Sequence, residues 1–118
     1  ESQPGEELSV IISSSKEPEL EVINQYRLYQ NYPNPFNPST RISYSLKERG
    51  YVKMMLYDLK GSIIDVLINE NKEAGYYEYE LDVSKYSLAS GIYLYRIEVI
   101  GEGNIPRFAD MKKMMLVK

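Results

Sequence analysis

The chain has 118 residues, with 14 Lys and Arg against 17 Asp and Glu, so its formal charge is −3. It contains neither Cys nor His, which excludes disulfides, thiolate nucleophiles, Ser–His relays and the usual zinc or haem sites. The length suits one domain with a single core, and an apolar fraction of 43% is too high for a disordered chain.

Charge divides the chain into an acidic leader and a mildly basic body. Residues 1–25 carry six carboxylates against Lys16 alone, whereas residues 26–118 have a small positive balance. Proteins that bind nucleic acid usually show a basic stripe and a high pI, so we expect no nucleic-acid partner. The leader is either a solvated linker or a segment that docks on a basic surface. It shows no secretory signal peptide, so an exported protein would appear here as a processed form or a fragment.

The leader also contains two short candidate strands, residues 7–12 and 20–23, joined by a Ser-rich spacer. The first has high β propensity and four apolar side chains: Leu8, Val10, Ile11 and Ile12. An apolar strand of this kind is expected to pair with a sheet edge, either of its own domain or of a neighbouring subunit.

A Pro- and Asn-rich stretch, residues 32–40, follows the leader. Its three prolines, Pro33, Pro35 and Pro38, remove backbone donors and disfavour helical conformations in the residues before them. The stretch is therefore expected to be an extended, turn-rich edge, in which Asn side chains satisfy local backbone groups.

The rest of the chain alternates between strand and turn patterns. Apolar residues recur with a period of two, which predicts strands with one face in a core, in residues 42–46, 52–56, 77–81 and 92–100. The apolar run 63–68 predicts a strand with a bulge. A last strand is expected at 108–117, without an inward face that the pattern assigns. Turn signals separate these segments at residues 47–50, 58–61, 69–75, 82–91 and 101–104.

Twelve tyrosines and about seven short strands predict an all-β fold, an antiparallel β-sandwich of immunoglobulin-like type. Tyr93 enters a strand just after a Gly-containing corner, so we expect its hydroxyl to bond to backbone a few residues upstream. No opposed carboxylate pair, Gly-rich phosphate loop or calcium loop is recognisable in the sequence. We therefore expect a protein that is no enzyme and has no metal, no cofactor and no small-molecule substrate.

Three segments carry a resemblance to a known family. Residues 28–44 read LYQNYPNPFNPSTRISY, residues 88–96 read LASGIYLYR and residues 112–118 read KKMMLVK. Together they resemble type A C-terminal sorting domains of the type IX secretion system, which end exported proteins of the Bacteroidetes and related phyla. The Ig-like domain of flagellar hook-capping proteins is a more distant likeness. The resemblance spans about residues 26–118 and leaves residues 1–25 as a leader or linker.

The resemblance implies a secretion signal that directs an exported protein across the outer membrane of a Gram-negative bacterium to the cell surface or beyond. The implied partners are the outer-membrane translocon and a sortase-like transpeptidase. Matched position by position, the residues for translocon recognition are Gly91, Tyr93, Arg96, Lys113 and Lys118. The family often carries a Trp-Asp-Gly-like step where this chain reads Leu81-Asp82-Val83, so the match implies no recognition role for that loop.

A second interpretation stays open, because only a short leader precedes the sorting-like domain. The sandwich itself is then the exported product, a surface or filament subunit that assembles with copies of itself. In that case residues 7–12 would be donated to the open sheet edge of the next subunit.

Overall fold

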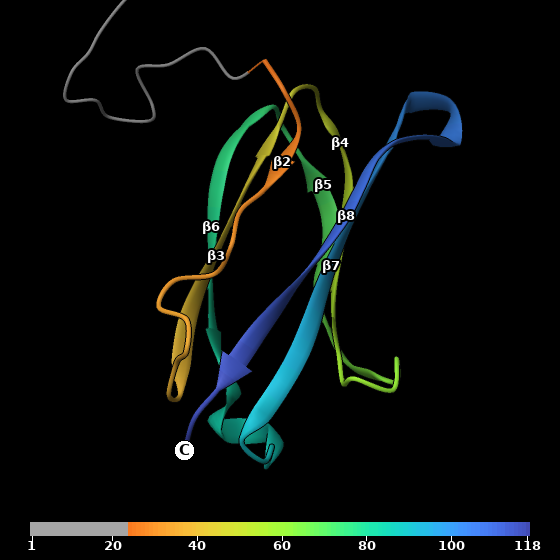
Figure 1. Cartoon of the computed structure of the whole chain (residues 1–118). Helices are drawn as coiled ribbons and strands as arrows, with labels where there is room; N and C mark the ends of the chain where they lie inside the picture. The colour runs from red at the N-terminus through yellow and green to blue at the C-terminus, as the bar shows by residue number, and fades with distance from the viewer. Residues whose placement is uncertain (1–23) are drawn as a thin grey trace, which may run out of the picture.

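The computed structural model describes residues 24–118. Within them, seven strands form two antiparallel sheets that face each other (Figure 1), in the orders β2-β3-β6 and β5-β4-β7-β8. The strands are β2 (Arg27–Leu28), β3 (Ser39–Leu46), β4 (Gly50–Tyr57), β5 (Ile63–Lys72), β6 (Gly75–Asp82), β7 (Gly91–Gly101) and β8 (Ile105–Leu116). The prediction of an all-β sandwich is confirmed. Among these residues, no helix is long and apolar enough to span a membrane.

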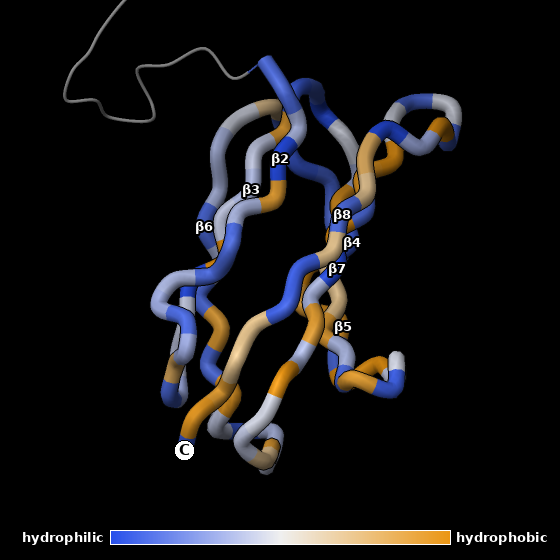
Figure 2. The backbone as a smooth tube through the Cα atoms, viewed as in Figure 1, coloured by the Kyte–Doolittle hydropathy of each residue, from blue (hydrophilic) through white to orange (hydrophobic). Residues whose placement is uncertain are grey.

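The core lies between the sheets, and the alternation in the sequence explains it. In β3, β4 and β7 every second side chain points inward, as expected for pleated strands with one buried face. The buried residues from these three strands include Ile42, Tyr44, Leu46, Val52, Met54, Leu56, Tyr93, Tyr95, Ile97 and Val99. In Figure 2 hydrophobic and hydrophilic positions are interspersed along the strands, and the colours differ from burial at the tyrosines, which this scale counts as hydrophilic although several are in the core. The period of two predicted for residues 92–100 is therefore confirmed, with the odd-numbered side chains in the core.

The β4–β5 ladder contains the predicted bulge and corrects one predicted turn. Its register shifts between Met54 and Met55 and again between Leu56 and Tyr57. The turn expected at 69–75 is much shorter, because β5 continues to Lys72, which pairs with Gly50. The polar residues 69–72 extend the ladder, and most of their side chains remain in solvent, so their polarity marks an exposed strand instead of a turn.

The last strand starts earlier than predicted and has a defined inward face. β8 begins at Ile105 instead of residue 108, and its pairing with β7 shifts register between Val99 and Ile100. Met114 and Leu116 are buried, whereas Met111 and Met115 are about half exposed. Even-numbered residues at the end of β8 therefore face the core. The leader strands expected at 7–12 and 20–23 lie outside the described residues.

Candidate functional site

The residues that the sequence implicates gather around the C-terminal end of β8. This strand forms one edge of the four-stranded sheet and ends beside the start of β7, where Leu116 pairs with Gly91. At this end, the outer faces of β8 and β7 present three pairs of side chains, which we call the terminal-strand face: Ile92, Leu94, Arg96, Met111, Lys113 and Met115. None of the six is buried.

Arg96 and Lys113 come together on this face. Lys113 is exposed and pairs with Leu94, and Arg96 lies in register between Met55 of β4 and Met111 of β8. The guanidinium of Arg96 contacts Glu98 two residues along the same strand, with 3.1 Å from Nε and 3.0 Å from Nη2 to Oε2. Arg96 is thus paired with a carboxylate, and Lys113 is an exposed cation beside apolar side chains on the same sheet surface.

Gly91 and Tyr93 occupy the corner that leads into β7. Gly91 has a φ of +155°, a conformation that L side chains rarely adopt, so the entry into the strand favours glycine there. The Tyr93 hydroxyl donates a 2.7 Å hydrogen bond to the carbonyl oxygen of Ala89, as predicted for a corner tyrosine. Neither residue belongs to the terminal-strand face. Their geometry serves the architecture of the corner.

Lys118 lies just beyond β8, at the same corner. Its backbone N–H donates a 2.9 Å hydrogen bond to Oγ of Ser90, and the residue is exposed. The end of the chain is therefore tied to the turn before Gly91, while the Lys118 side chain remains available to a partner.

The outer edge of β8 is covered by residues 30–38, which we call the Pro–Asn segment. Within it, Phe36 forms a parallel bridge with Leu116. The Phe36 N–H donates to the Met115 carbonyl, and the Val117 N–H donates to the Phe36 carbonyl, both at 3.0 Å. The backbone of the Pro–Asn segment thus occupies the place of an additional strand beside the end of β8.

Two side chains of the Pro–Asn segment complete this contact. Oδ1 of Asn34 accepts a 2.9 Å hydrogen bond from the Met115 N–H. Nε2 of Gln30 donates a 2.6 Å hydrogen bond to the carbonyl of Lys113. Backbone groups of β8 that face its outer edge therefore find partners in the Pro–Asn segment.

Buried polar groups fix the shape of the Pro–Asn segment. Nδ2 of Asn31 donates to Oγ1 of Thr40 at 2.9 Å and to the carbonyl of Pro33 at 3.1 Å. The Thr40 hydroxyl donates to the same Pro33 carbonyl at 2.8 Å. Asn31 and Thr40 are 2% and 1% exposed, so their mutual bonding satisfies groups that would be costly to bury alone. Local backbone bonding was predicted for the Asn side chains of residues 32–40, but it is Asn31, just before that stretch, that bonds locally, whereas Asn34 bonds to the distant Met115.

The Phe36 side chain anchors the segment in the core, where it is 3% exposed. Tyr95 reaches the same region from β7, and its hydroxyl donates a 2.7 Å hydrogen bond to the carbonyl of Tyr29. Burial raises the pKa of Tyr95 from 10.0 to about 12. Phe36 therefore holds the Pro–Asn segment against the sandwich, and the tyrosine bond holds the residue just before it.

The comparison with protein families identifies the kind of domain that contains these residues. Residues 30–106 match the family described as the secretion system C-terminal sorting domain. The chain belongs to this family. The match contains the whole Pro–Asn segment and the corner with Gly91, Tyr93 and Arg96, and it ends at the second residue of β8. No curated protein matches the sorting domain.

A solved structure shares the fold of the sorting domain. It is the crystal structure of dimeric latent PorU from Porphyromonas gingivalis, with a TM-score of 0.59 and 22% sequence identity. The similarity covers 92% of this chain but only 10% of that one. At this identity the likeness shows the fold alone.

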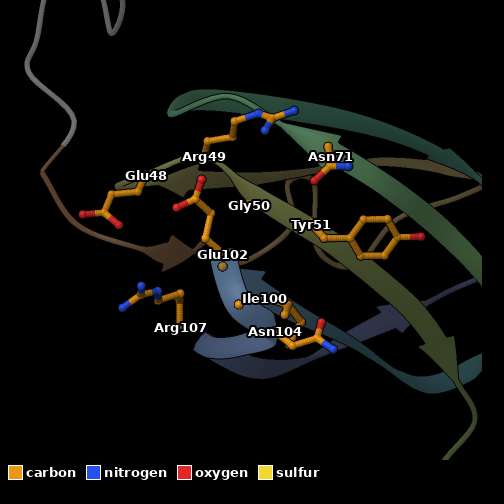
Figure 3. A pocket seen from close by; sticks show the side chains of 11 residues that line it. Glu48, Arg49, Gly50, Tyr51, Asn71, Ile100, Glu102, Asn104 and Arg107 are labelled. Atoms are coloured by element: carbon orange, nitrogen blue, oxygen red, sulfur yellow. The ribbon is translucent and has the colours of Figure 1, made fainter.

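The sorting domain also has a hollow of about 510 Å³ at its opposite end. The turn between β3 and β4 and the hairpin between β7 and β8 line it, and Figure 3 shows Glu48, Arg49, Glu102 and Arg107 around it. Its lining carries charges of both signs. Among the described residues, no group of three His, Cys, Asp or Glu side chains is placed to hold a metal. The hollow lies apart from every residue that the sequence singled out.

Sequence reasoning missed the contact between the Pro–Asn segment and β8. The three prolines indicated an extended edge but gave no partner for it. The available signal was Phe36, an isolated large apolar residue among polar and proline neighbours, because such a side chain is expected to be buried. Neither Gln30 nor Asn34 was singled out, since a long-range hydrogen bond leaves no local pattern.

Proposed function

We propose that this sorting domain is the signal that directs an exported protein through the type IX secretion system to the cell surface. Family membership carries this proposal, because the matched family is defined by that role at the C terminus of secreted proteins. The domain begins near Tyr26, which stacks on Phe108 of β8 with ring centroids 5.6 Å apart. We therefore take residues 1–25 as the linker to an upstream cargo and 26–118 as the signal.

The terminal-strand face is the part of the domain that the outer-membrane translocon binds. Two features support this assignment. Met111 and Met115 are 47% and 41% exposed, and flexible thioether side chains adapt readily to a partner surface. Arg96 and Lys113 add cationic groups beside them, which favours a partner surface with carboxylates.

Gly91 and Tyr93 contribute by shaping the corner, and Lys118 extends the basic charge at the strand end. The sortase-like transpeptidase then acts on the cargo side of the domain.

The test is surface display of a reporter fused upstream of the full chain in a host with an active type IX system. The wild-type fusion should reach the surface. Lys113→Glu should leave most of the reporter in the periplasm, because it reverses an exposed charge of the terminal-strand face. Lys47→Glu is the matched control, since Lys47 is an exposed lysine in the turn between β3 and β4. Periplasmic retention of the wild-type fusion would overturn the proposed function, and equal display of both variants would overturn the assigned face.

Deletion of residues 114–118 is a less informative test. It removes the buried side chains of Met114 and Leu116 together with the backbone groups that Phe36 bonds. Loss of export would then report on folding as much as on recognition. The point substitution at Lys113 avoids this, because its side chain is exposed and its backbone remains.

The filament interpretation rests on residues 7–12, outside the described residues, and stays a prediction. It requires self-association, so size-exclusion chromatography of the full chain at high concentration tests it. A monomer would leave the secretion signal as the function, whereas polymers lost in Val10→Asp would support strand donation.

A further inference from the structure

The exposed edge of a sheet carries unpaired N–H and C=O groups that readily accept a strand from another protein. β8 is the last strand of its sheet, and a partner that recognises its outer edge by strand addition would need those groups free. The state of this edge therefore decides how a partner can bind the end of the sorting domain.

The edge is closed at the end of β8, from the Lys113 carbonyl to the Val117 N–H. The Lys113 carbonyl, the Met115 N–H and carbonyl, and the Val117 N–H are all bonded by the Pro–Asn segment. Two residues before Lys113 on the same strand, the Met111 N–H donates to Oδ1 of its neighbour Asp110 at 2.8 Å. A side chain thus occupies that donor as well, and it places a negative charge on the edge.

Opening the edge would dismantle well-packed structure. Phe36 would leave the core, and the Asn31–Thr40–Pro33 network that shapes the segment would lose its support. The terminal-strand face, by contrast, is accessible while the edge stays closed, because its side chains project perpendicular to the direction of the edge bonds.

We infer that Gln30, Asn34 and Phe36 are positioning residues that keep the edge closed at the end of β8, so that the translocon binds the side chains of the terminal-strand face and adds no strand there. The partner surface that fits this face has apolar contacts and carboxylates for Lys113 and Arg96. This inference rests on the proposed function and assigns a role to the Pro–Asn segment.

A disulfide across the edge tests the inference directly. Asn37 and Val117 each follow one member of the parallel Phe36–Leu116 bridge, and both are exposed. Because the residues that follow a parallel bridge face each other, Asn37→Cys with Val117→Cys is expected to bring the two thiols within reach of a disulfide. The chain has no other cysteine. The oxidised fusion should reach the surface as efficiently as the same variant kept reduced, with each single cysteine variant as a control. Export of the reduced form and retention of the oxidised form would overturn the inference, because the edge would then have to open.

Substitutions at Asn34 test the positioning role. Asn34→Ala removes the acceptor from the Met115 N–H, whereas Asn34→Asp keeps an oxygen there. In the purified full chain, exchange of the Met115 amide should be about five- to tenfold faster in the alanine variant and near wild type in the aspartate variant, given the net strength of one hydrogen bond. Surface display should fall several-fold in Asn34→Ala and recover in Asn34→Asp, while the alanine variant stays folded, with a urea midpoint lowered by no more than the loss of one hydrogen bond accounts for.

Display of Asn34→Ala at the wild-type level, despite faster exchange, would show that closing the edge has no part in recognition. The proposed function and the inference fail separately. A wild-type fusion that stays in the periplasm contradicts the secretion signal, while amide exchange at Met115 still reports whether the edge is closed.

Discussion

Asn34 accepts a 2.9 Å hydrogen bond through Oδ1 from the backbone N–H of Met115, a residue 81 positions further along the chain. This bond joins two of the sequence segments that carry the family resemblance, the Pro–Asn segment and the basic-apolar C terminus. Because the two segments share one sheet edge, a change in either is expected to alter the other. The Pro–Asn segment and the end of β8 thus form one structural unit.

Phe36→Ala should destabilise the domain strongly. The side chain is 3% exposed and belongs to the core cluster, so its loss leaves a cavity and removes the anchor of the Pro–Asn segment. We expect the free energy of unfolding to fall by about 3–5 kcal/mol, measured by urea denaturation. Phe36→Leu, which keeps an apolar anchor, should cost much less. A loss below about 1 kcal/mol in the alanine variant would show that the anchor contributes little.

Tyr93→Phe removes one hydrogen bond and leaves the ring in place. The lost contact is the 2.7 Å bond from the Tyr93 hydroxyl to the Ala89 carbonyl. We expect the free energy of unfolding to fall by about 1 kcal/mol, seen as a lower urea midpoint. Tyr32→Phe is the control, because Tyr32 is 78% exposed and should tolerate the change. An unchanged midpoint for Tyr93→Phe would mean that the corner bond adds no stability.

The strands of the sandwich were predictable because their signal is local. Alternation in residues 42–46, 52–56 and 92–100 follows from one buried and one solvated face, and the tyrosine corner follows from the Gly91 turn. The end of β5 was not predictable, because polar residues pair as readily as apolar ones where their side chains face solvent. The same limit applies to the Pro–Asn segment, whose partner on β8 is set by tertiary packing.

The domain should lose stability at alkaline pH. Burial raises the pKa of Tyr95 to about 12, against 10.0 when the residue is exposed. Its contribution is therefore complete below pH 10 and is lost as the pH rises from 10 towards 12, by about 1.4 kcal/mol per pH unit. Urea midpoints measured between pH 8 and 11 should fall above pH 10. Tyr95→Phe should reduce that fall, and an equal slope in both proteins would contradict the role of Tyr95.

Arg96→Gln should separate recognition from stability. Arg96 contributes a partly exposed ion pair with Glu98 on the same strand, and such pairs are worth at most about 1 kcal/mol. The urea midpoint should therefore change little, while surface display of the reporter fusion should fall several-fold, because the terminal-strand face loses a cation.

Arg41→Gln is the matched control, since Arg41 pairs with Glu78 and Glu80 at 3.7 and 3.8 Å on the outer face of the other sheet. Both variants remove one arginine charge from an exposed sheet surface, so a general effect of charge on export would appear in both. Equal display of the two variants would remove Arg96 from the recognition surface, and a selective loss in Arg96→Gln would place the translocon contact on the face formed by β7 and β8.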